Sequence, residues 1–369
     1  MRVLTVLGTR PEIIRLSRII PLLDQLCEHR VLHTGQNYDE RLNQIFFDEL
    51  GLRAPDQVLN TRSETPMGQI AAILTGCEQS MLDWRPDRLL LLGDTNSALA
   101  AFVAKRMGIP VLHMEAGNRC YDDRVPEEVN RRVIDHSSDI LMPYTERSRA
   151  NLLKEGIAGQ QIYVTGNPIF EVLQHHQDSI KASEILTELN LTAGGYFLVS
   201  LHREENVDLP KRLQAFALAL GRLAEHYRMP VICSTHPRTR IRLEATGLAA
   251  HPSIRWLPPF GLFDFVRLEQ QAYCVLSDSG TVQEECCIFK VPNLTLRDVT
   301  ERPETIEVGS NLLTGADPDR IMAGVALVTA GKPAWSPPPE YLAPAVSQTV
   351  ARIVLGYQHQ RDVHQQQEA

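Results

Sequence analysis

The sequence predicts an α/β protein made of two Rossmann-like domains that face a central cleft. Short apolar runs alternate with amphipathic stretches along almost the whole chain of 369 residues. The apolar runs have the length of buried strands, and the amphipathic stretches carry apolar residues at helical spacing. This βαβ alternation is typical of a doubly wound parallel sheet. A chain of this length is also long for one hydrophobic core, which favours two domains.

The first half opens with a strand over 2–7, which leads through the stretch 8–12 into a helical pattern over 13–26. Strand-like runs and helical patterns alternate from there. The expected strands lie at 29–35, 87–92, 110–114, 139–145 and 161–167, and the expected helices at 67–82, 97–107, 127–138 and 146–156.

The second half resumes this alternation after a polar, helical stretch over 170–190. We therefore expect the two domains at 1–172 and 173–345, with no close sequence repeat between them. A cleft between two such domains suits a medium-sized ligand, and long loops facing the cleft would close over it. The expected strands lie at 197–201, 230–238, 253–259, 274–277 and 293–299, and the expected helices at 209–227, 263–272 and 281–290.

Composition narrows the class of partner. The net charge of −8 argues against a nucleic-acid surface. No apolar run is long enough for a membrane span, and the run at the start is too short for a signal-peptide core. The seven cysteines form no C-x-x-C pair, which is typical of reduced thiols in a cytoplasmic protein. Neither half carries a G-x-G-x-x-G or P-loop motif, so we expect no dinucleotide cofactor, and we assign no metal site.

Carboxylates from three segments of the first half are expected at one rim of its sheet. Asp94 follows one apolar strand, Glu115 follows the next, and Glu127 and Glu128 lie in the polar segment beyond. Ligands bind at this edge of an open parallel sheet, and several carboxyls in one cleft suit proton transfer at an unactivated carbon. For each acid alone, the structural alternative is a helix N-cap or a first-turn acid.

Two strand–turn–helix junctions are suited to anions. The stretch 8–11 leaves the first strand, with Arg10 beside free backbone N–H groups and Pro11 in the first helical turn. The stretch 277–280 leaves another strand and opens a helix, where hydroxyl and N–H groups can cradle a diphosphate. The alternative for each junction is a plain tight turn with an N-cap.

Basic residues follow other strands of the second half. His202 and Arg203 come directly after one apolar strand, and His236 and Arg238 follow the next. Such pairs can neutralise a leaving phosphate or transfer a proton. A lone histidine at such a place is more often a structural hydrogen-bonding group. The charged loop at 297–302 also follows a strand, and its structural alternative is a salt-bridged surface turn.

Several short motifs connect these stretches: GTRPE at 8–12, GDT at 93–95, EAGNR at 115–119, PEEVNR at 126–131, HRE at 202–204, SDSG at 277–280 and ERPE at 301–304. In order and spacing they resemble the non-hydrolysing UDP-N-acetylglucosamine 2-epimerase family, over nearly the whole chain. The fold of that family is the two-domain arrangement called GT-B, in which the last helix crosses back to the N-terminal domain. The resemblance therefore implies that 346–360 packs on the first domain.

The resemblance also implies roles for individual residues. Asp94, Glu115, Glu127 and His202 match the catalytic positions of the family. Arg15 stands where relatives often have Lys, which keeps the charge but not the geometry. Of the expected substrate-binding residues, Arg10, Ser279 and Gly280 match diphosphate contacts, Glu285 matches the acid that holds the uridine ribose, Phe265 matches the aromatic residue that packs on uracil, and Arg131, Arg203, His236 and Arg302 complete the set.

In this family UDP is lost from C1 of the sugar as the C2 proton leaves, and UDP then adds back with protonation on the opposite face of C2. Inversion at C2 needs proton-transfer groups on both faces of the ring, which fits several carboxyls and a histidine. Positive charge and N–H donors would stabilise the leaving diphosphate. The implied partner is a UDP-activated amino sugar for surface polysaccharide synthesis, and the implied assembly is a homodimer.

Two stretches depart from relatives that act on UDP-N-acetylglucosamine. Those relatives commonly have H-R-R-E where this chain has HREE at 202–205, and A-Q-H-R-E where it has GQNYD at 35–39. In them these regions help to hold a second, activating UDP-N-acetylglucosamine, so we do not expect that regulatory site here. The chain looks closer to the branch that makes rarer sugars. Candidate substrates are UDP-2,3-diacetamido-2,3-dideoxy-glucuronic acid, the UDP-6-deoxy-L-talose-type precursor of UDP-N-acetyl-L-fucosamine, and UDP-N-acetylglucosamine.

The sequence leaves three other functions open. A GT-B glycosyltransferase would bind the same UDP-sugar, but it would need an acceptor and no acid set such as Glu115 and Glu127. A hydrolysing 2-epimerase would release UDP and free sugar, and a single loop could decide between the two outcomes. A catalytically silent nucleotide-sugar sensor is the third, and the intact acid set argues against it.

Overall fold

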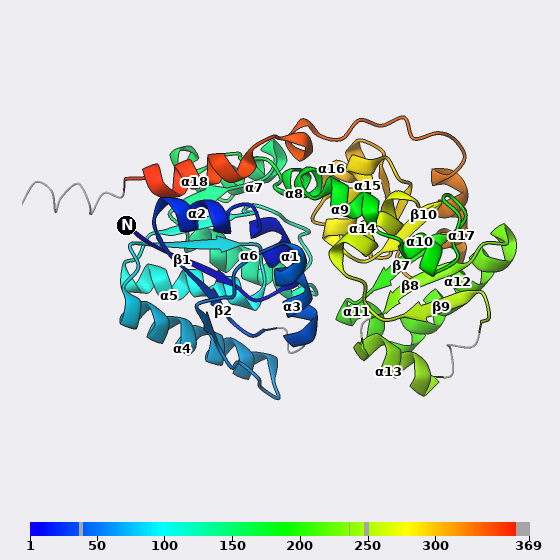
Figure 1. Cartoon of the computed structure of the whole chain (residues 1–369), viewed down its shortest axis with the longest axis horizontal. Coiled ribbons are helices and arrows are strands. Elements are labelled where there is room, and N and C mark those ends of the chain that lie inside the picture. Colours follow the sequence, from blue (N-terminus) through cyan, green and yellow to red (C-terminus); the bar gives the residue numbers. More distant parts are fainter. Residues whose placement is uncertain (37–39, 236, 247–250, 359–369) are drawn as a thin grey trace, which may run out of the picture. The chain divides into compact units, whose positions relative to one another are not determined.

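Each half of the chain forms a parallel six-stranded sheet of its own (Figure 1). The computed structural model describes residues 1–36, 40–235, 237–246 and 251–358. The chain divides into two units: unit 1 is Met1–Gln174 with the segment that begins at Glu340, and unit 2 is His175–Pro339. The predicted α/β class with two Rossmann-like domains is confirmed.

The sheet of unit 1 has the strand order β3-β2-β1-β4-β5-β6, and all its pairs are parallel. This is the order of a Rossmann fold, in which growth of the sheet reverses direction between β1 and β4. The strands are β1 (Arg2–Leu7), β2 (Glu28–His33), β3 (Gln57–Val58), β4 (Arg88–Leu92), β5 (Val111–Met114) and β6 (Ile140–Met142).

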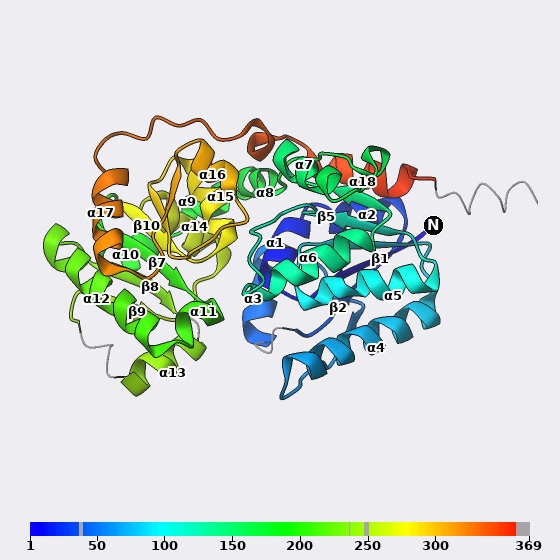
Figure 2. The same cartoon turned by 180° about the vertical axis from the view of Figure 1, so that it is seen from behind.

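Helices cover both faces of this sheet. Figure 2 shows α4, α5 and α6 side by side on one face, and Figure 1 shows α1 and α2 on the other. None of the described helices is both long and apolar enough to cross a membrane. The helices of unit 1 are α1 (Arg10–Leu16), α2 (Ile20–Leu26), α3 (Glu40–Glu49), α4 (Pro66–Trp84), α5 (Ala100–Met107), α6 (Pro126–His136), α7 (Glu146–Lys154), α8 (Ile169–His175) and α18 (Val346–Gly356).

The central strands of unit 1, β1, β4 and β5, are mostly apolar because both faces of the sheet are covered. β4 is buried along its whole length, and α4 and α5 pack on the sheet through side chains such as Met81 and Ala104. Arg88, at the start of β4, is buried and donates to the backbone carbonyls of Val354 and Tyr357. These hydrogen bonds attach the C-terminal end of α18 to the sheet of unit 1.

Two predicted features differ from the structure, and two short strands were not predicted. The predicted helix over 13–26 is broken into α1 and α2, because Pro21 lacks the N–H of a continuous helix and fits the first turn of a new one. The predicted strand at 161–167 is wrong, since Ile162 makes only an isolated bridge to Leu141. The unpredicted strands are β3 and β12 (Asn311–Leu313), which are only two and three residues long.

The sheet of unit 2 has the order β12-β11-β10-β7-β8-β9 and is also parallel. Growth of this sheet reverses direction between β7 and β10, so unit 2 repeats the Rossmann order of unit 1. The remaining strands are β7 (Phe197–Leu201), β8 (Val231–Thr235), β9 (Ile254–Leu257), β10 (Cys274–Ser277) and β11 (Asn293–Thr295), and the helices are α9 (Gln177–Ala182), α10 (Ile185–Glu188), α11 (Glu204–Val207), α12 (Pro210–Tyr227), α13 (Pro237–Thr246), α14 (Leu262–Gln270), α15 (Gly280–Phe289), α16 (Pro303–Glu307) and α17 (Pro318–Val328).

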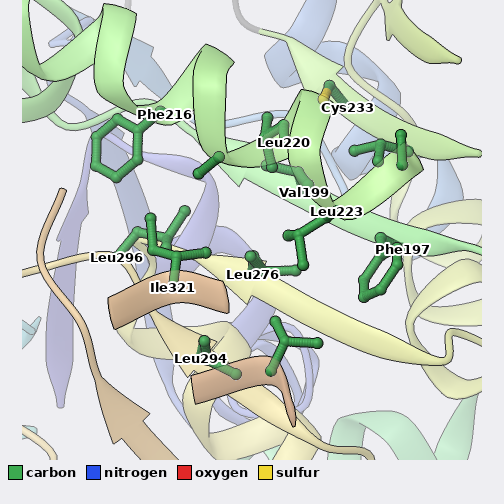
Figure 3. Close-up of a cluster of buried hydrophobic side chains, with 14 of the residues drawn as sticks. Phe197, Val199, Phe216, Leu220, Leu223, Cys233, Leu276, Leu294, Leu296 and Ile321 are labelled. Atoms are coloured by element: carbon green, nitrogen blue, oxygen red, sulfur yellow. The ribbon is translucent and has the colours of Figure 1, made fainter. Parts of the chain in front are cut away.

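Alternate residues of the unit 2 strands enter two separate clusters of apolar side chains. Figure 3 shows one cluster, in which Phe216 and Leu220 of α12 meet Val199 and Leu276 of the strands. Val275, which precedes Leu276 on β10, belongs to the other cluster, to which α14 and α15 contribute. Successive side chains of a strand point to opposite faces, so both faces of this sheet are packed.

Candidate active site

The loops that carry the predicted acids of unit 1 leave one edge of its sheet. β1, β4 and β5 are parallel neighbours, so their carboxyl ends share that edge. Gly8 follows β1, Asp94 lies just past β4, and Glu115 follows β5 directly. The reversal of strand order between β1 and β4 lies at this edge, and open α/β sheets bind ligands at such a point. The structure thus brings Asp94 and Glu115 to one rim.

Glu115 forms a buried ion pair with Arg15. The Nη1 atom of Arg15 lies 2.7 Å from Oε2 of Glu115, and the two side chains are 3% and 5% exposed. The Tyr144 hydroxyl and the Asn118 amide also donate to the Glu115 carboxylate, each at 3.4 Å. The φ angle of Glu115 is 63°, a left-handed conformation that residues other than glycine seldom adopt. Arg15, predicted to bind substrate, therefore also fixes the carboxylate of Glu115.

Asp94 is held by Arg131, a buried arginine that joins two acids. Nε and Nη2 of Arg131 each lie 2.8 Å from Oδ2 of Asp94, and Nη1 lies 2.6 Å from Oε2 of Glu128. The Asn130 amide donates to the backbone carbonyl of Asp94 at 3.0 Å. The Asp94 side chain is still 24% exposed. The buried Arg131 therefore orients the Asp94 carboxylate, which remains accessible at the rim.

The two adjacent glutamates at the start of α6 have different environments. Glu128 is fully buried and accepts hydrogen bonds from the backbone N–H groups of Cys120 and Tyr121, each at 3.0 Å. Burial alone would raise the pKa of Glu128, but the N–H of Cys120 and the charge of Arg131 hold it below its usual value. Glu127 is only partly buried in the first turn of the helix. Glu128 therefore supports the loop at 120–121, and Glu127 is the more accessible acid.

His113 on β5 supports the turn that carries Asp94. Its Nε2 lies 2.8 Å from the carbonyl oxygen of Gly93, and its Nδ1 lies 2.9 Å from Oδ1 of Asp135. Arg119 lies 2.8 Å from the other oxygen of Asp135. Burial would raise the pKa of Asp135, but His113 and Arg119 outweigh burial and lower it. None of these three residues, His113, Asp135 and Arg119, was among the predicted site residues, although a histidine inside an apolar strand is a sequence signal for such a network.

Glu12 on α1 is another buried acid that the sequence analysis did not single out. It is 2% exposed, and it accepts hydrogen bonds from the N–H groups of Gly8 and Thr9 and from the Thr95 hydroxyl. Burial raises the pKa of Glu12 to about 7, although these hydrogen bonds oppose the rise. The spacing of Thr9 and Glu12 is that of a capping box, which is the sequence signal for this contact.

The turn after β1 is too tight for any side chain at Gly8. A Cβ at this position would lie 2.1 Å from Oγ1 of Thr34 and 2.2 Å from Oγ of Ser97. Arg10 follows in the first turn of α1, with its guanidinium carbon 5.7 Å from the centre of the Phe46 ring. Arg10, predicted to contact a diphosphate, therefore lies at the same edge as Asp94 and Glu115.

In unit 2, Asp278 joins the two loops that flank the reversal of strand order. It accepts hydrogen bonds from the N–H groups of His202, at 3.1 Å, and Arg203, at 3.0 Å. Nδ1 of His202 lies 2.8 Å from Oδ1 of Asp278. Burial would raise the pKa of Asp278, but the charge and hydrogen bond of His202 lower it to about 2. The His202 side chain is 43% exposed, so Asp278 orients a ring that stays open to solvent.

The helix α15 starts at this edge of unit 2. Ser279 is its N-cap, and its side chain makes no capping hydrogen bond. A Cβ at Gly280 would lie 2.8 Å from Oε1 of Glu301, so only a bare backbone fits beside that carboxylate. Arg302 is buried and donates to the carboxylate of Glu284. N–H groups at a helix start with positive charge close by are suited to a phosphate group.

The acid predicted to hold a ribose, Glu285, lies on the buried side of α15. Glu269 of α14 is fully buried next to it, and the Cys286 thiol donates to Oε1 of Glu269 at 3.2 Å. Burial raises the pKa of Glu269 well above its usual value, and the carboxylate of Glu285 raises it further. Phe265, predicted to pack on uracil, is partly buried on α14.

Two further expectations concern the charged segments of unit 2. The alternative considered for 297–302 was a salt-bridged surface turn. It is wrong about exposure, because Arg297 and Arg302 are buried. The expected ion pair is present, since Arg297 lies 2.8 Å from Glu301. Arg203 lies 3.8 Å from the other oxygen of Glu301. His236 lies outside the described residues. Within the described part of the chain, no group of three or more His, Cys, Asp or Glu side chains is arranged to hold a metal ion.

Comparison with known proteins identifies the family. The model of the UDP-N-acetylglucosamine 2-epimerase family matches residues 23–355. The UDP-N-acetylglucosamine 2-epimerase of Methanocaldococcus jannaschii is 41% identical over 347 residues, which cover 92% of this chain and 95% of that protein. The UDP-2,3-diacetamido-2,3-dideoxy-D-glucuronate 2-epimerase of Pseudomonas aeruginosa is 35% identical over 328 residues, which cover 87% of this chain and 90% of that protein.

A solved structure has the same fold over nearly the whole chain. The crystal structure of the M. jannaschii UDP-GlcNAc 2-epimerase, in complex with UDP-GlcNAc and UDP, matches with a TM-score of 0.92 and 39% identity. The match covers 97% of this chain and 100% of that chain. It confirms the GT-B class of fold that the motifs predict. The chain belongs to the UDP-N-acetylglucosamine 2-epimerase family, and it is an isomerase of the UDP-sugar 2-epimerase type.

Proposed function

We propose that this chain inverts C2 of a UDP-2-acetamido-2-deoxy sugar without net hydrolysis. UDP leaves C1 while a base takes the C2 proton, which gives a 2-acetamidoglycal and UDP. UDP then returns to C1 while an acid delivers a proton to the opposite face of C2. The observation that carries this proposal is the pair of carboxylates, Asp94 and Glu115, at one sheet edge, each held by a buried arginine. Proton transfer on both faces of a ring needs more than one such group.

The acids of unit 1 are proposed to act on the sugar. Arg131 binds Asp94 and Arg15 binds Glu115, so each carboxylate is held in a fixed orientation by a buried guanidinium. Glu127 is proposed as the third acid because it is accessible, whereas its neighbour Glu128 is committed to backbone N–H groups.

The edge of unit 2 is proposed to hold the nucleotide. The helix start at Ser279 and Gly280, together with His202, would stabilise the negative charge that develops on the leaving diphosphate. Asp278 supports this role of His202, because its carboxylate fixes one ring nitrogen and leaves the other available. Further proposed contacts are Glu285 for the ribose, Phe265 for uracil, and Arg131, Arg203, His236 and Arg302 for the rest of the substrate.

The names of the two relatives support two of the three candidate sugars. UDP-N-acetylglucosamine is the first to test, because the M. jannaschii relative that carries this name is 41% identical. UDP-2,3-diacetamido-2,3-dideoxy-glucuronic acid is the second, supported by the P. aeruginosa relative and by the stretches EAGNRCYD and HREENVD. The precursor of UDP-N-acetyl-L-fucosamine is the third. Each would supply a precursor for surface polysaccharide.

The proposal is tested by incubating the chain in D2O with each candidate UDP-sugar. NMR then follows the incorporation of deuterium at C2 and the release of free UDP. Deuterium at C2 with the UDP-sugar retained is the expected result. Stoichiometric free UDP would instead indicate the hydrolysing reaction. No exchange with any of the sugars would overturn the proposal in favour of sugar transfer or sensing. Asp94→Asn and Glu115→Gln are each expected to abolish the exchange.

We also propose that the active form is a cytoplasmic homodimer. All seven cysteines are free thiols, which fits a reducing compartment. Large apolar side chains, Leu82 of α4, Phe102 of α5 and Val133 of α6, are exposed on the helices that Figure 2 shows side by side. Obligate homodimer interfaces are rich in apolar side chains, and a second copy of the chain would cover these three. Light scattering of the purified chain tests the dimer.

A further inference from the structure

We infer that Glu12 and Thr95 form a tether that positions Asp94 for proton transfer. This inference rests on the proposed function, in which Asp94 is one of the reacting acids. Glu12 and Thr95 are positioning residues in this view, since neither is proposed to touch the sugar. The tether would matter for the rate of the chemical step and not for the affinity of the nucleotide.

The two oxygens of the Glu12 carboxylate bind two different loops. Oε2 accepts hydrogen bonds from the N–H of Gly8 at 2.5 Å and from the N–H of Thr9 at 2.9 Å. Oε1 accepts a hydrogen bond from the Thr95 hydroxyl at 2.5 Å. Gly8 and Thr9 follow β1, and Thr95 follows β4 immediately after Asp94. One carboxylate therefore joins the loops on both sides of the point where the strand order of unit 1 reverses.

A helix cap alone does not account for this arrangement. In a capping box the glutamate side chain returns to the backbone of its own helix start, which Oε2 of Glu12 already does. The bond from Oε1 spans 83 residues of sequence to another strand of the sheet. At 2% exposure, Glu12 forms this bond where water competes little, so the bond restrains the position of Thr95.

Asp94 is held from its other side by Arg131, so the tether completes its restraint. Arg131 binds the Asp94 side chain, the His113 ring binds the carbonyl of the preceding Gly93, and Glu12 binds the side chain of the following Thr95. The charge of Asp94 also acts on Glu12, since it contributes to the raised pKa of Glu12. Holding an acid from three directions is what accurate proton transfer requires, because a small misplacement is costly in rate.

The test compares Thr95→Val, which removes the hydroxyl at nearly constant volume, with Thr95→Ser, which keeps it. We expect Thr95→Val to lower kcat for C2 exchange by about 10- to 100-fold while KM and the Kd for UDP stay near the wild-type values. Thr95→Ser is expected to retain most of the wild-type kcat. A Thr95→Val variant with a wild-type kcat would overturn the inference, and so would one that loses only thermal stability.

A second measurement keeps this inference separate from the proposed function. Backbone amide hydrogen–deuterium exchange in the peptide that contains residues 93–96 is expected to be faster in Thr95→Val but not in Thr95→Ser. This measurement does not depend on catalytic activity. Unchanged exchange in Thr95→Val would show that there is no tether. A wild-type chain that incorporates no deuterium at C2 of any candidate sugar would refute the proposed function. The amide exchange of the 93–96 peptide would then test by itself whether the tether exists.

Discussion

Arg15→Met should lower the free energy of unfolding of unit 1 far more than the double variant Arg15→Met/Glu115→Gln does. The two side chains are 3% and 5% exposed, and their closest charged atoms are 2.7 Å apart. Loss of one partner from such a buried pair leaves an uncompensated charge and costs about 3–5 kcal/mol. We therefore expect Arg15→Met to lower the free energy of unfolding of unit 1 by that amount.

The double variant Arg15→Met/Glu115→Gln should recover most of this loss, because it contains no buried charge at the pair. Tyr144 and Asn118 contact different oxygens of the Glu115 carboxylate, so the Gln oxygen can accept the hydrogen bond from the Asn118 amide while the Gln NH2 group donates to the Tyr144 hydroxyl oxygen. The double variant should nevertheless show no C2 exchange, since Glu115 is a proposed reacting acid. Recovery of stability without recovery of activity would separate the structural role of the ion pair from its chemical role.

Tryptophan fluorescence can follow unit 1 by itself. The chain has three tryptophans, of which Trp84 lies in unit 1 and Trp256 and Trp335 lie in unit 2. A Trp256→Phe/Trp335→Phe background leaves Trp84 on α4 as the reporter for urea unfolding. An Arg15→Met variant within about 1 kcal/mol of this background would refute the reasoning. A raised KM with unchanged stability would show instead that Arg15 acts mainly on the substrate.

Three further predictions concern other charged or exposed groups. Glu127→Gln should lose C2 exchange at an unchanged Tm, whereas Glu128→Gln should lower the Tm because Glu128 holds two N–H groups and Arg131. The pKa of Asp278 is lowered to about 2, so its stabilisation is present above about pH 4 and about 2 kcal/mol of it is lost as the pH falls toward 2. The unfolding free energies of the wild type and Asp278→Asn should therefore converge in acid. Phe102→Glu should give a monomer by light scattering, and an unchanged mass would exclude this face as the dimer interface.

The sequence was informative about the strands at the centre of each sheet. β1, β4, β7 and β10 are buried over nearly their whole length from both faces and therefore consist mainly of apolar residues. β3 gave no such signal, because it has two residues and both are exposed. The run at 161–167 has the sequence signal of a strand but does not form one. Its short apolar run, 162–164, resembles a strand, yet the stretch forms only an isolated bridge between Ile162 and Leu141.

The position of the candidate acids was also predictable, whereas their partners were not. Asp94 and Glu115 follow adjacent strands, and a parallel sheet must bring them to one edge. The partner of Glu115 is 100 residues away along the sequence, and the partner of Asp94 is 37 residues away. No local pattern encodes such pairings, because they depend on which helix packs beside which loop. Glu12 was overlooked because a capping-box glutamate is ordinarily a local feature.

Three buried acids of unit 1, Glu12, Glu128 and Asp135, have pKa values that are shifted in different directions according to their partners. Glu128 and Asp135 are buried beside arginines, and their pKa values are lowered in spite of burial. Glu12 is equally buried, but its partners among the described residues are the N–H groups of Gly8 and Thr9 and the Thr95 hydroxyl, and burial raises its pKa to about 7. A raised pKa means that the stability contributed by protonated Glu12 is present below about pH 4.5 and is lost as the pH rises through about 7. Glu12→Gln should therefore remove part of the fall in unfolding free energy between these pH values. An unchanged pH profile would show that Glu12 is held as firmly in its ionised form as the acids that pair with arginine.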